Sequence, residues 1–83
     1  MEEKIGKITH FFSKIGIAVL EVTTGSIKVG DTIHLVGHGI DFSQVISSMQ
    51  VDHAPVTEVQ AGESAGLKID QLVKEGVEVF KVS

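Results

Sequence analysis

Glycines spaced as in a phosphate-binding loop are the first feature of this 83-residue sequence that could do chemistry. Gly25 and Gly30 stand five positions apart, which matches the first half of the G-x-x-x-x-G-K-S/T loop that wraps nucleotide phosphates. That loop continues with a lysine and opens a helix, whereas here Asp31 follows and TIHLV alternates like a strand. Because a carboxylate would face the phosphates, the sequence predicts no bound nucleotide, and it carries no signature of another cofactor.

Four histidines invite a metal site, but their spacing argues against one. His34 and His38 are four positions apart, which suits one face of a helix, whereas on an extended chain their Cα atoms lie about 13 Å apart. Two imidazoles at that distance cannot share a zinc ion with bonds of about 2 Å. His38 and Asp41, in one glycine-containing stretch, form a better pair, and cysteine is absent. We predict no metal and expect all four histidines, His10, His34, His38 and His53, in solvent or at strand edges.

Serine, histidine and aspartate are all present, yet no nucleophile motif accompanies them. Ser13, Ser47 and Ser48 lack the G-x-S-x-G context that presents a nucleophilic serine at a sharp turn. Carboxylates beside turns usually accept hydrogen bonds from backbone N–H groups rather than transfer protons. We therefore expect no catalytic residues and no enzyme activity, and a small enzyme is kept as a third alternative below.

The charges disfavour general nucleic-acid binding, since seven lysines face eleven acidic residues, the net charge is −4 and arginine is absent. DNA is not expected as a partner, because arginine, which is absent, makes the paired hydrogen bonds that best match guanine edges and phosphates.

Phe11 and Phe12 are adjacent on a predicted strand, so one of them points outward. That ring is either covered by a loop or available for base stacking. Lys7, Lys14 and Lys68 gathered beside Phe12 would favour a weak site for RNA or for an acidic partner.

Apolar residues recur with a period of two along most of the chain, which predicts short strands joined by turns. We expect strands over 4–12, 16–22, 32–36, 43–53, 64–69 and 77–82. The residues predicted to face inward include Ile33, Leu35, Ala65, Leu67 and Ile69. The residues assigned to structural turns are Gly25, Gly30, Asp31, Gly37, Gly62 and Gly66.

Three segments carry finer predictions. We expect a loop over 37–42, and one long strand over 43–53 that places Val45, Met49 and Val51 on one face, with a bulge or a close approach of backbone near Ser47. Segment 70–76 is too short for more than one helical turn. Together these elements predict an all-β fold, a small closed antiparallel β-barrel of six to seven strands, because closure removes the free edges of so small a sheet.

The length predicts a single domain over 1–83. The acidic N-terminus lacks the basic start and apolar core of a signal peptide, and no apolar run approaches the roughly 20 residues that span a bilayer. We therefore expect a cytoplasmic protein without a membrane partner.

Two motifs resemble the second domain of elongation factor Tu and related translational GTPases. The stretch GSIKVGD at 25–31, followed by an apolar strand and Gly37, is similar to the turn that opens this domain, and AGESAGL at 61–67 is similar to its later "AGE-N/S-x-G" turn. The apolar strand VISSMQV lies between them at the expected distance, and 77–82 corresponds to the closing strand. The resemblance covers nearly the whole chain. It implies a translation-protein barrel, of the type common to reductases, isomerases and elongation factors, without the GTPase domain.

The resemblance also implies a binding surface, because the second domain of elongation factor Tu holds the aminoacylated 3′ end of tRNA in a pocket on the barrel surface. The positions that match this pocket are His10, Phe12, Ile17, Val19, Gln50, Ser64 and Lys68. This sequence departs from the family pattern near Thr9-His10, where the family has an acidic pair, and at Ser64, where it has an amide.

Two functions therefore remain open beside the small enzyme. The first is a non-catalytic binding module that contacts RNA, a tRNA end or a translation-linked protein, as the resemblance implies. The second is a protein-interaction subunit of a separate enzyme, which the acidic charge and missing arginine favour. A positive, concave surface around Phe12, Ser64 and Lys68 would support RNA, and a flat apolar one would support a protein partner.

Overall fold

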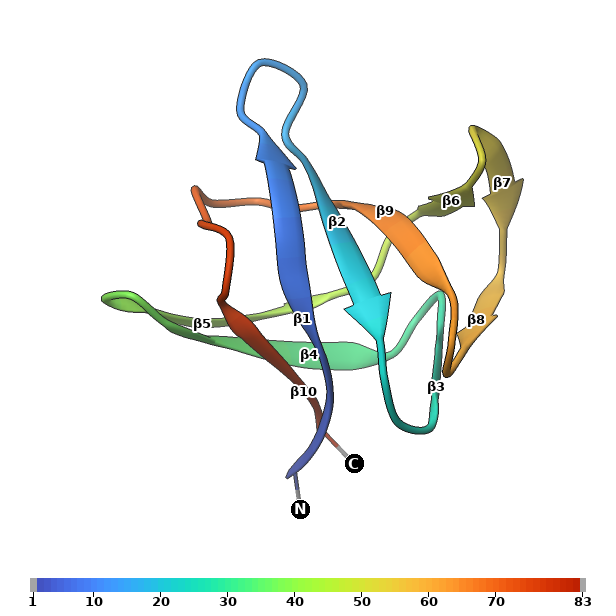
Figure 1. The fold of residues 1–83 in the computed structure, drawn as a ribbon, viewed down its shortest axis with the longest axis horizontal. Helices are drawn as coiled ribbons and strands as arrows, with labels where there is room; N and C mark the ends of the chain where they lie inside the picture. The colour runs from blue at the N-terminus through green and yellow to red at the C-terminus, as the bar shows by residue number, and fades with distance from the viewer. Residues whose placement is uncertain (1, 83) are drawn as a thin grey trace.

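The computed structural model describes residues 2–82, and over that range the backbone forms strands and turns (Figure 1). In chain order the strands are β1 (Glu2–Phe12), β2 (Ile17–Val22), β3 (Ser26–Lys28), β4 (Thr32–Gly37), β5 (Ile40–Val45), β6 (Met49–Val51), β7 (Ala54–Val56), β8 (Glu58–Gln60), β9 (Ser64–Lys68) and β10 (Glu78–Val82). The prediction of an all-β protein is confirmed. The described range contains no helix with the length and apolarity to cross a membrane.

Eight strands form one antiparallel sheet in the order β5-β4-β10-β1-β2-β9-β6-β7, and β3 pairs with β8 in a second sheet. Figure 1 shows the large sheet curling so that β4 and β5 pass behind β1 and β2. The first and last strands are neighbours, with Glu2 opposite Val82, as Figure 1 shows for β1 and β10. The result is the predicted barrel-like fold, built from ten short strands rather than six or seven.

One apolar core fills the interior of this sheet. Alternate residues of each strand point inward, so Ile33 and Leu35 on β4 and Ala65 and Leu67 on β9 are at most 1% exposed. Ile69, just after β9, is also buried, which confirms the inward residues predicted from the pattern. Burying one isoleucine or leucine side chain contributes about 1.5–3 kcal/mol, so this alternation is the main source of the fold's stability.

A buried amide side chain joins two strands that are not neighbours in the sheet. Within residues 2–82, the polar side chain that is buried in the core is Gln44 on β5. Its nitrogen donates to the carbonyl of Lys68 at 2.9 Å, and its oxygen accepts from the N–H of Asp70 at 2.9 Å. The side chain therefore acts like a backbone peptide group and connects the β5 end of the sheet to the end of β9.

Glycine conformation explains several of the tight turns. Four of the residues assigned to turns have φ between 70° and 136°, where glycine is favoured: Gly25, Gly30, Gly37 and Gly62. In the turn 28–31 the Asp31 N–H donates to the Lys28 carbonyl at 3.0 Å, and the Asp31 carboxylate accepts from the Lys28 N–H at 2.9 Å. Gly66 lies inside β9 without a positive φ, so its assignment to a turn is wrong.

Three predicted segments differ from the structure. The loop expected over 37–42 is a two-residue turn between β4 and β5, in which Gly37 lies opposite Ile40. The strand expected over 43–53 is interrupted at 46–48, because β5 pairs with β4 whereas β6 pairs with β9. Val45 is consequently 56% exposed while Met49 is buried. Segment 70–76 contains turns rather than a helical turn, and the three-residue strands β3, β7 and β8 were not predicted.

Candidate functional site

The residues predicted to bind lie together on the outer face of β1, β2, β9 and β6. Directly opposed residues of antiparallel strands point to the same face of a sheet. One row across the strands consists of Phe12, Ile17 and Lys68. The next row consists of His10, Val19, Gly66 and Gln50. Ser64 is the following outward position of β9, opposite Glu21. The structure thus brings all seven predicted residues onto one surface.

A bulge in β1 turns two of these side chains outward. Ile8 pairs with Leu20, and the next pair is His10 with Val19, so Thr9 is an extra residue in the ladder. In a regular ladder without the bulge, Thr9 would pair with Val19 and His10 with buried Ala18, so His10 would point into the core. The bulge therefore places His10 and Phe12 on the surface.

A hollow of about 350 Å³ opens on this face, and we call it the first hollow. Its lining consists of Phe12, Ile15, Ile17, Val19, Gln50, Asp52, His53, Ser64, Ala65 and Gly66. Five of the seven predicted residues belong to it, namely Phe12, Ile17, Val19, Gln50 and Ser64. His10 and Lys68 stand beside it on the same strands. Phe12 is 52% exposed, so its aromatic ring is accessible to solvent at the edge of the hollow.

Gly66 accounts for the depth of the first hollow. It occupies the centre of the second row, between Val19 and Gln50, and offers no side chain there. A Cβ at this position would lie 3.2 Å from Cγ2 of Ile17. The glycine that the sequence analysis assigned to a turn is therefore part of the site.

The rim of the first hollow includes a hairpin turn with unusual backbone conformation. Asp52 and His53 join β6 to β7 with φ of 52° and 65°, and both line the hollow. A two-residue turn with two positive φ values normally contains glycine, because other L-residues resist this conformation. The absence of glycine explains why the sequence analysis placed this segment inside a strand and missed both residues.

A second hollow of about 550 Å³ lies on the other side of Phe12. Its lining consists of His10, Phe11, Phe12, Ser13, Val73, Lys74 and Glu75. The rings of His10 and Phe12 are stacked, with centroids 6.4 Å apart and planes at 27°. His10 Nδ1 lies 3.9 Å from a Glu75 carboxylate oxygen. Two neighbouring hollows thus share one exposed aromatic ring.

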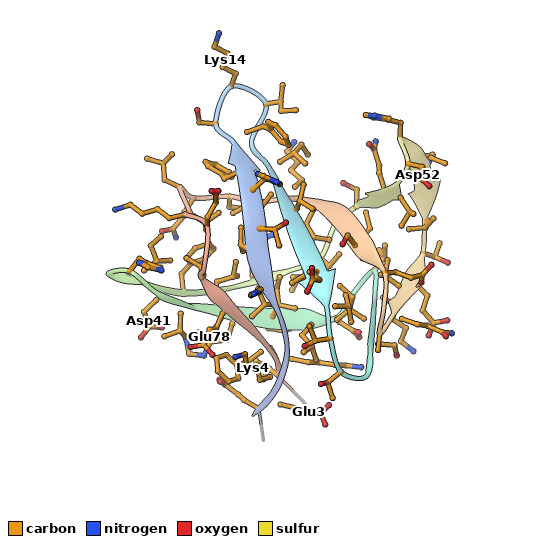
Figure 2. All side chains as sticks on the ribbon, in the orientation of Figure 1. Glu3, Lys4, Lys14, Asp41, Asp52 and Glu78 are labelled. Carbon is orange, nitrogen blue, oxygen red and sulfur yellow. The ribbon has the colours of Figure 1, made fainter. Side chains whose placement is uncertain are left out.

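The charge around Phe12 is mixed. Lys68 lies in the Phe12 row, Lys74 lines the second hollow, and Figure 2 shows Lys14 at the tip of the hairpin between β1 and β2. Figure 2 also labels Asp52, at the hairpin between β6 and β7. Within residues 2–82 the lysines found in ion pairs are Lys4 and Lys81. The surface is concave and apolar with lysines nearby, and Asp52 keeps it from being uniformly positive.

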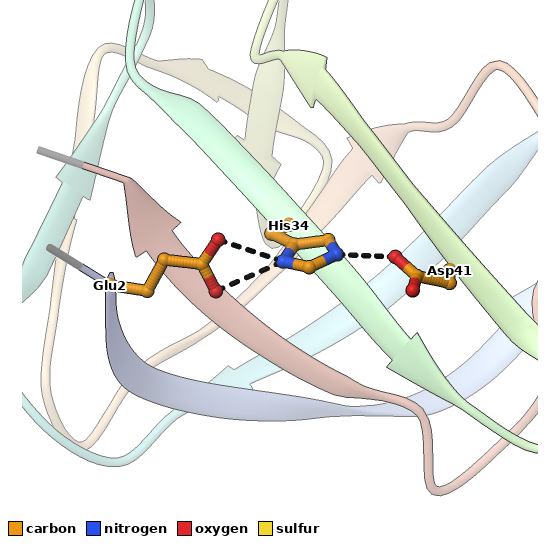
Figure 3. Close-up of polar contacts among 3 residues, drawn as sticks. All are labelled: Glu2, His34 and Asp41. Atoms are coloured by element: carbon orange, nitrogen blue, oxygen red, sulfur yellow. Dashed lines mark hydrogen bonds and ion pairs between the residues drawn. The ribbon is translucent and has the colours of Figure 1, made fainter.

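A separate polar cluster surrounds His34 on β4 (Figure 3). Its Nε2 lies 2.5 Å from the Asp41 carboxylate, and its Nδ1 lies 2.9 Å from both carboxylate oxygens of Glu2. These hydrogen bonds, first to Asp41 and then to Glu2, raise the pKa of His34. The hairpin register places Asp41 beside His34, and its carboxylate is hydrogen-bonded to that ring.

The His34 cluster does not resemble a metal site, because the two carboxylates lie at opposite nitrogens of one ring. No group of three or more metal-binding side chains with suitable geometry occurs between residues 2 and 82.

Residues 16–78 match a protein family described as elongation factor Tu domain 2. The chain is also 35% identical over 78 residues to a protein named as an uncharacterized protease of Methanocaldococcus jannaschii. That match covers 93% of this chain but 19% of the archaeal protein, so the chain spans about a fifth of that relative.

Solved structures show the same fold. The C-terminal domain of a candidate U32 peptidase of Geobacillus thermoleovorans superimposes with a TM-score of 0.89 and 18% identity, over 98% of this chain and 93% of that one. The selenomethionine form of the same domain gives a TM-score of 0.86 and 18% identity, over 93% and 96%.

Proposed function

Because this chain belongs to the elongation factor Tu domain 2 family, we propose that it is a non-catalytic binding module that holds the end of a single-stranded RNA, such as a tRNA end, in the first hollow. The observation that carries this proposal is the common outer face of the seven predicted residues, five of which line one hollow. The pairing of β2, β9 and β6 places five of them on this face, the bulge at Thr9 adds His10 and Phe12, and Gly66 leaves space between them.

The chemistry of the hollow fits a nucleoside. Phe12 offers an exposed ring face, and stacking of a base on an aromatic side chain contributes about 1–3 kcal/mol. Ile17 and Val19 provide apolar walls, while Gln50 and Ser64 supply hydrogen-bonding groups of both kinds. The nearby lysines meet the phosphates. Because they are few and the net charge is −4, we expect weak binding that depends strongly on salt.

Titration of the 83-residue chain with a single-stranded ribo-oligonucleotide, followed through backbone amide NMR signals at low and moderate salt, tests this proposal. We expect shifts at Phe12, Ile17, Val19 and Gly66, and weaker binding as salt rises. Phe12→Ala is expected to weaken binding by roughly 5-fold or more, as loss of one stacking contact implies. Val45→Ala, which also trims an exposed apolar side chain but on β5, is the matched control. Unchanged signals at low salt would reject the RNA ligand.

A protein partner is the second candidate. The apolar first hollow has Asp52 but no lysine in its lining, which suits a protein surface with a positive charge. If RNA leaves the backbone amide signals unchanged in the same titration, the protein partner is the function that stands.

Catalysis is proposed to belong to other proteins or domains. The relatives carry protease or peptidase names, but the chain matches 19% of the archaeal protein and a C-terminal domain of the bacterial one. In the described part of the chain, the Nε2 atom of His34 is hydrogen-bonded to Asp41. Its Nδ1 atom faces Glu2, where a catalytic triad would have a serine. This histidine therefore lacks the serine that a Ser-His-Asp triad requires.

A further inference from the structure

The seven lysines fall into two groups. Four lie opposite carboxylates of neighbouring segments, namely Lys4 with Glu78, Lys81 with Asp31, Lys7 with Glu21 and Glu78, and Lys28 with Glu58. The other three surround Phe12. Lys68 lies in the same row as this ring and Lys74 lines the second hollow beside it, while Figure 2 shows Lys14 at the tip of the hairpin that follows it. Positive charge therefore gathers at one end of a protein whose net charge is −4.

Large apolar side chains are exposed at the same end. Phe12, Ile15 and Leu72 are 52%, 66% and 73% exposed. The turn that carries Ile15 contacts the end of β9, because the N–H of Ile69 donates to the carbonyl of Gly16 at 2.9 Å. The segment with Leu72 continues from there into the lining of the second hollow. Apolar side chains gathered on a surface mark an interaction site. We call the exposed residues Phe12, Lys14, Ile15, Lys68, Leu72 and Lys74 the hairpin end.

We propose that the hairpin end and the second hollow bind an acidic segment of a partner protein, in which carboxylate and apolar side chains alternate. In an extended peptide, residues two positions apart lie about 7 Å from each other on the same side, so carboxylates and apolar groups occupy opposite sides. The carboxylates of the segment face Lys14, Lys68 and Lys74. Its apolar side chains cover Leu72 and enter the second hollow.

The lining of the second hollow combines apolar and charged groups. Phe11 and Val73 provide apolar walls, and Lys74 provides an ammonium group. The volume of about 550 Å³ lies within the range of about 300–1,000 Å³ that is typical of ligand pockets. Glu75 is the carboxylate of this lining, and the imidazole of His10, 3.9 Å away, offsets its charge only when protonated. Glu75 therefore weakens the attraction of Lys74 for an acidic ligand, which the variants below test.

Composition and charge favour a protein over a nucleic acid at the hairpin end. A nucleic-acid backbone supplies charge without apolar side chains, and it pairs best with arginine, which this sequence lacks. Because the net charge is −4, an acidic segment is repelled by most of the surface and directed to the three lysines. The first hollow has Asp52 and no lysine in its lining, so the segment is directed to the second hollow instead. This partner is independent of the RNA end proposed for the first hollow.

Fluorescence anisotropy with three short labelled peptides tests this partner. The first alternates aspartate with leucine, the second replaces every aspartate by lysine, and the third replaces every leucine by serine. We expect the first to bind at least about 10-fold more tightly than either of the others, because only it offers both charge complementarity and apolar burial. Its affinity should fall as salt rises. Equal affinity for the three peptides would overturn the proposal.

Substitutions of exposed residues test the location. Lys14→Ala combined with Lys74→Ala should weaken binding of the first peptide by roughly 10-fold, as loss of two exposed charge pairs implies. Lys28→Ala, on β3 at the opposite end of the molecule in Figure 1, is the control and should leave the affinity unchanged. Glu75→Gln removes the opposing carboxylate and should strengthen binding by about 2-fold.

Leu72→Ser tests the apolar contact. It should weaken binding of the first peptide by roughly 5-fold, whereas Val45→Ser, which changes an exposed apolar residue of β5, should not. Circular dichroism checks that the melting temperature of each variant is unchanged.

Backbone amide NMR signals separate this site from the first hollow. The first peptide should shift the signals of Leu72, Lys74 and Glu75. Peptide shifts confined to Val19 and Gly66 would overturn the proposal, and so would RNA that shifts the signals of 72–75 while the peptide does not. RNA that shifts only the first hollow supports the proposed function and leaves the peptide result to decide this partner.

Discussion

At the scale of single residues, the absence of one side chain shapes the proposed site. Gly66 needs no special backbone conformation, so its value lies in the space that it leaves beside Ile17. Neither composition nor motif shows this, because the family turn around Gly62 suggested a second turn glycine. Only the pairing of β9 with β2 and β6 places Gly66 at the centre of the outer face.

Gly66→Val is expected to abolish RNA binding while leaving the fold intact. The new side chain would fill the first hollow, and its Cβ would lie 3.2 Å from the Cγ2 methyl of Ile17, which must shift by a few tenths of an ångström. Valine suits a strand, so the free energy of unfolding should change by less than about 1 kcal/mol. Binding is measured by anisotropy and stability by urea unfolding. Ser43→Val on the exposed face of β5 is the control, and equal loss of binding in that variant would contradict the role given to Gly66.

His34 makes stability depend on pH. Both ring nitrogens face carboxylates, and only the imidazolium has an N–H at each. Because the folded pKa of His34 is raised above its ordinary 6.5, its stabilising contribution is complete below that value and is lost as pH rises through the folded pKa. We expect the free energy of unfolding to fall more between pH 6 and 8 in the wild type than in His34→Gln. Identical slopes in the two proteins would refute the assignment.

At the scale of elements, alternation predicted where the strands run but not where they break or which neighbours they take. TIHLV and the last strand follow their pattern from end to end, because each keeps the same neighbours throughout. The segment 43–53 looks continuous, yet β5 and β6 pair with different strands. The bulge at Thr9 leaves no mark in composition either, although it decides that Phe12 rather than Phe11 is the exposed ring.

The hairpin turn between β6 and β7 is expected to become more stable when its strain is relieved. His53 has φ of 65°, so His53→Gly should raise the free energy of unfolding by roughly 0.5–1 kcal/mol. Ala54→Gly, one residue later in β7, should lower it by a similar amount, because glycine weakens an ordinary strand position. Urea unfolding of both variants measures the difference. Destabilisation by both changes would show that the turn is not strained.

At the scale of the whole molecule, the family motifs and the alternating pattern were enough to predict the barrel-like fold. What they could not show is how the curled sheet is joined near its β5 end. In the sheet, β5 pairs with one strand, β4. The Gln44 side chain connects β5 to a second segment through the Lys68 carbonyl and the Asp70 N–H. A glutamine among alternating strand residues looks like any surface amide in a sequence, since its burial depends on two backbone groups from a distant segment.

Gln44→Ala tests whether this amide holds the barrel together. The change leaves the Lys68 carbonyl and the Asp70 N–H without their partner, which costs about 1–3 kcal/mol. For a domain of this size that lowers the melting temperature by roughly 4 °C or more. Gln71→Ala, in the exposed segment that follows β9, should shift it by far less. Circular dichroism measures the melting temperature, and hydrogen exchange at Asp70 should become faster in Gln44→Ala. A variant that melts like the wild type and keeps Asp70 protected would mean that backbone pairing alone holds β5 against the end of β9.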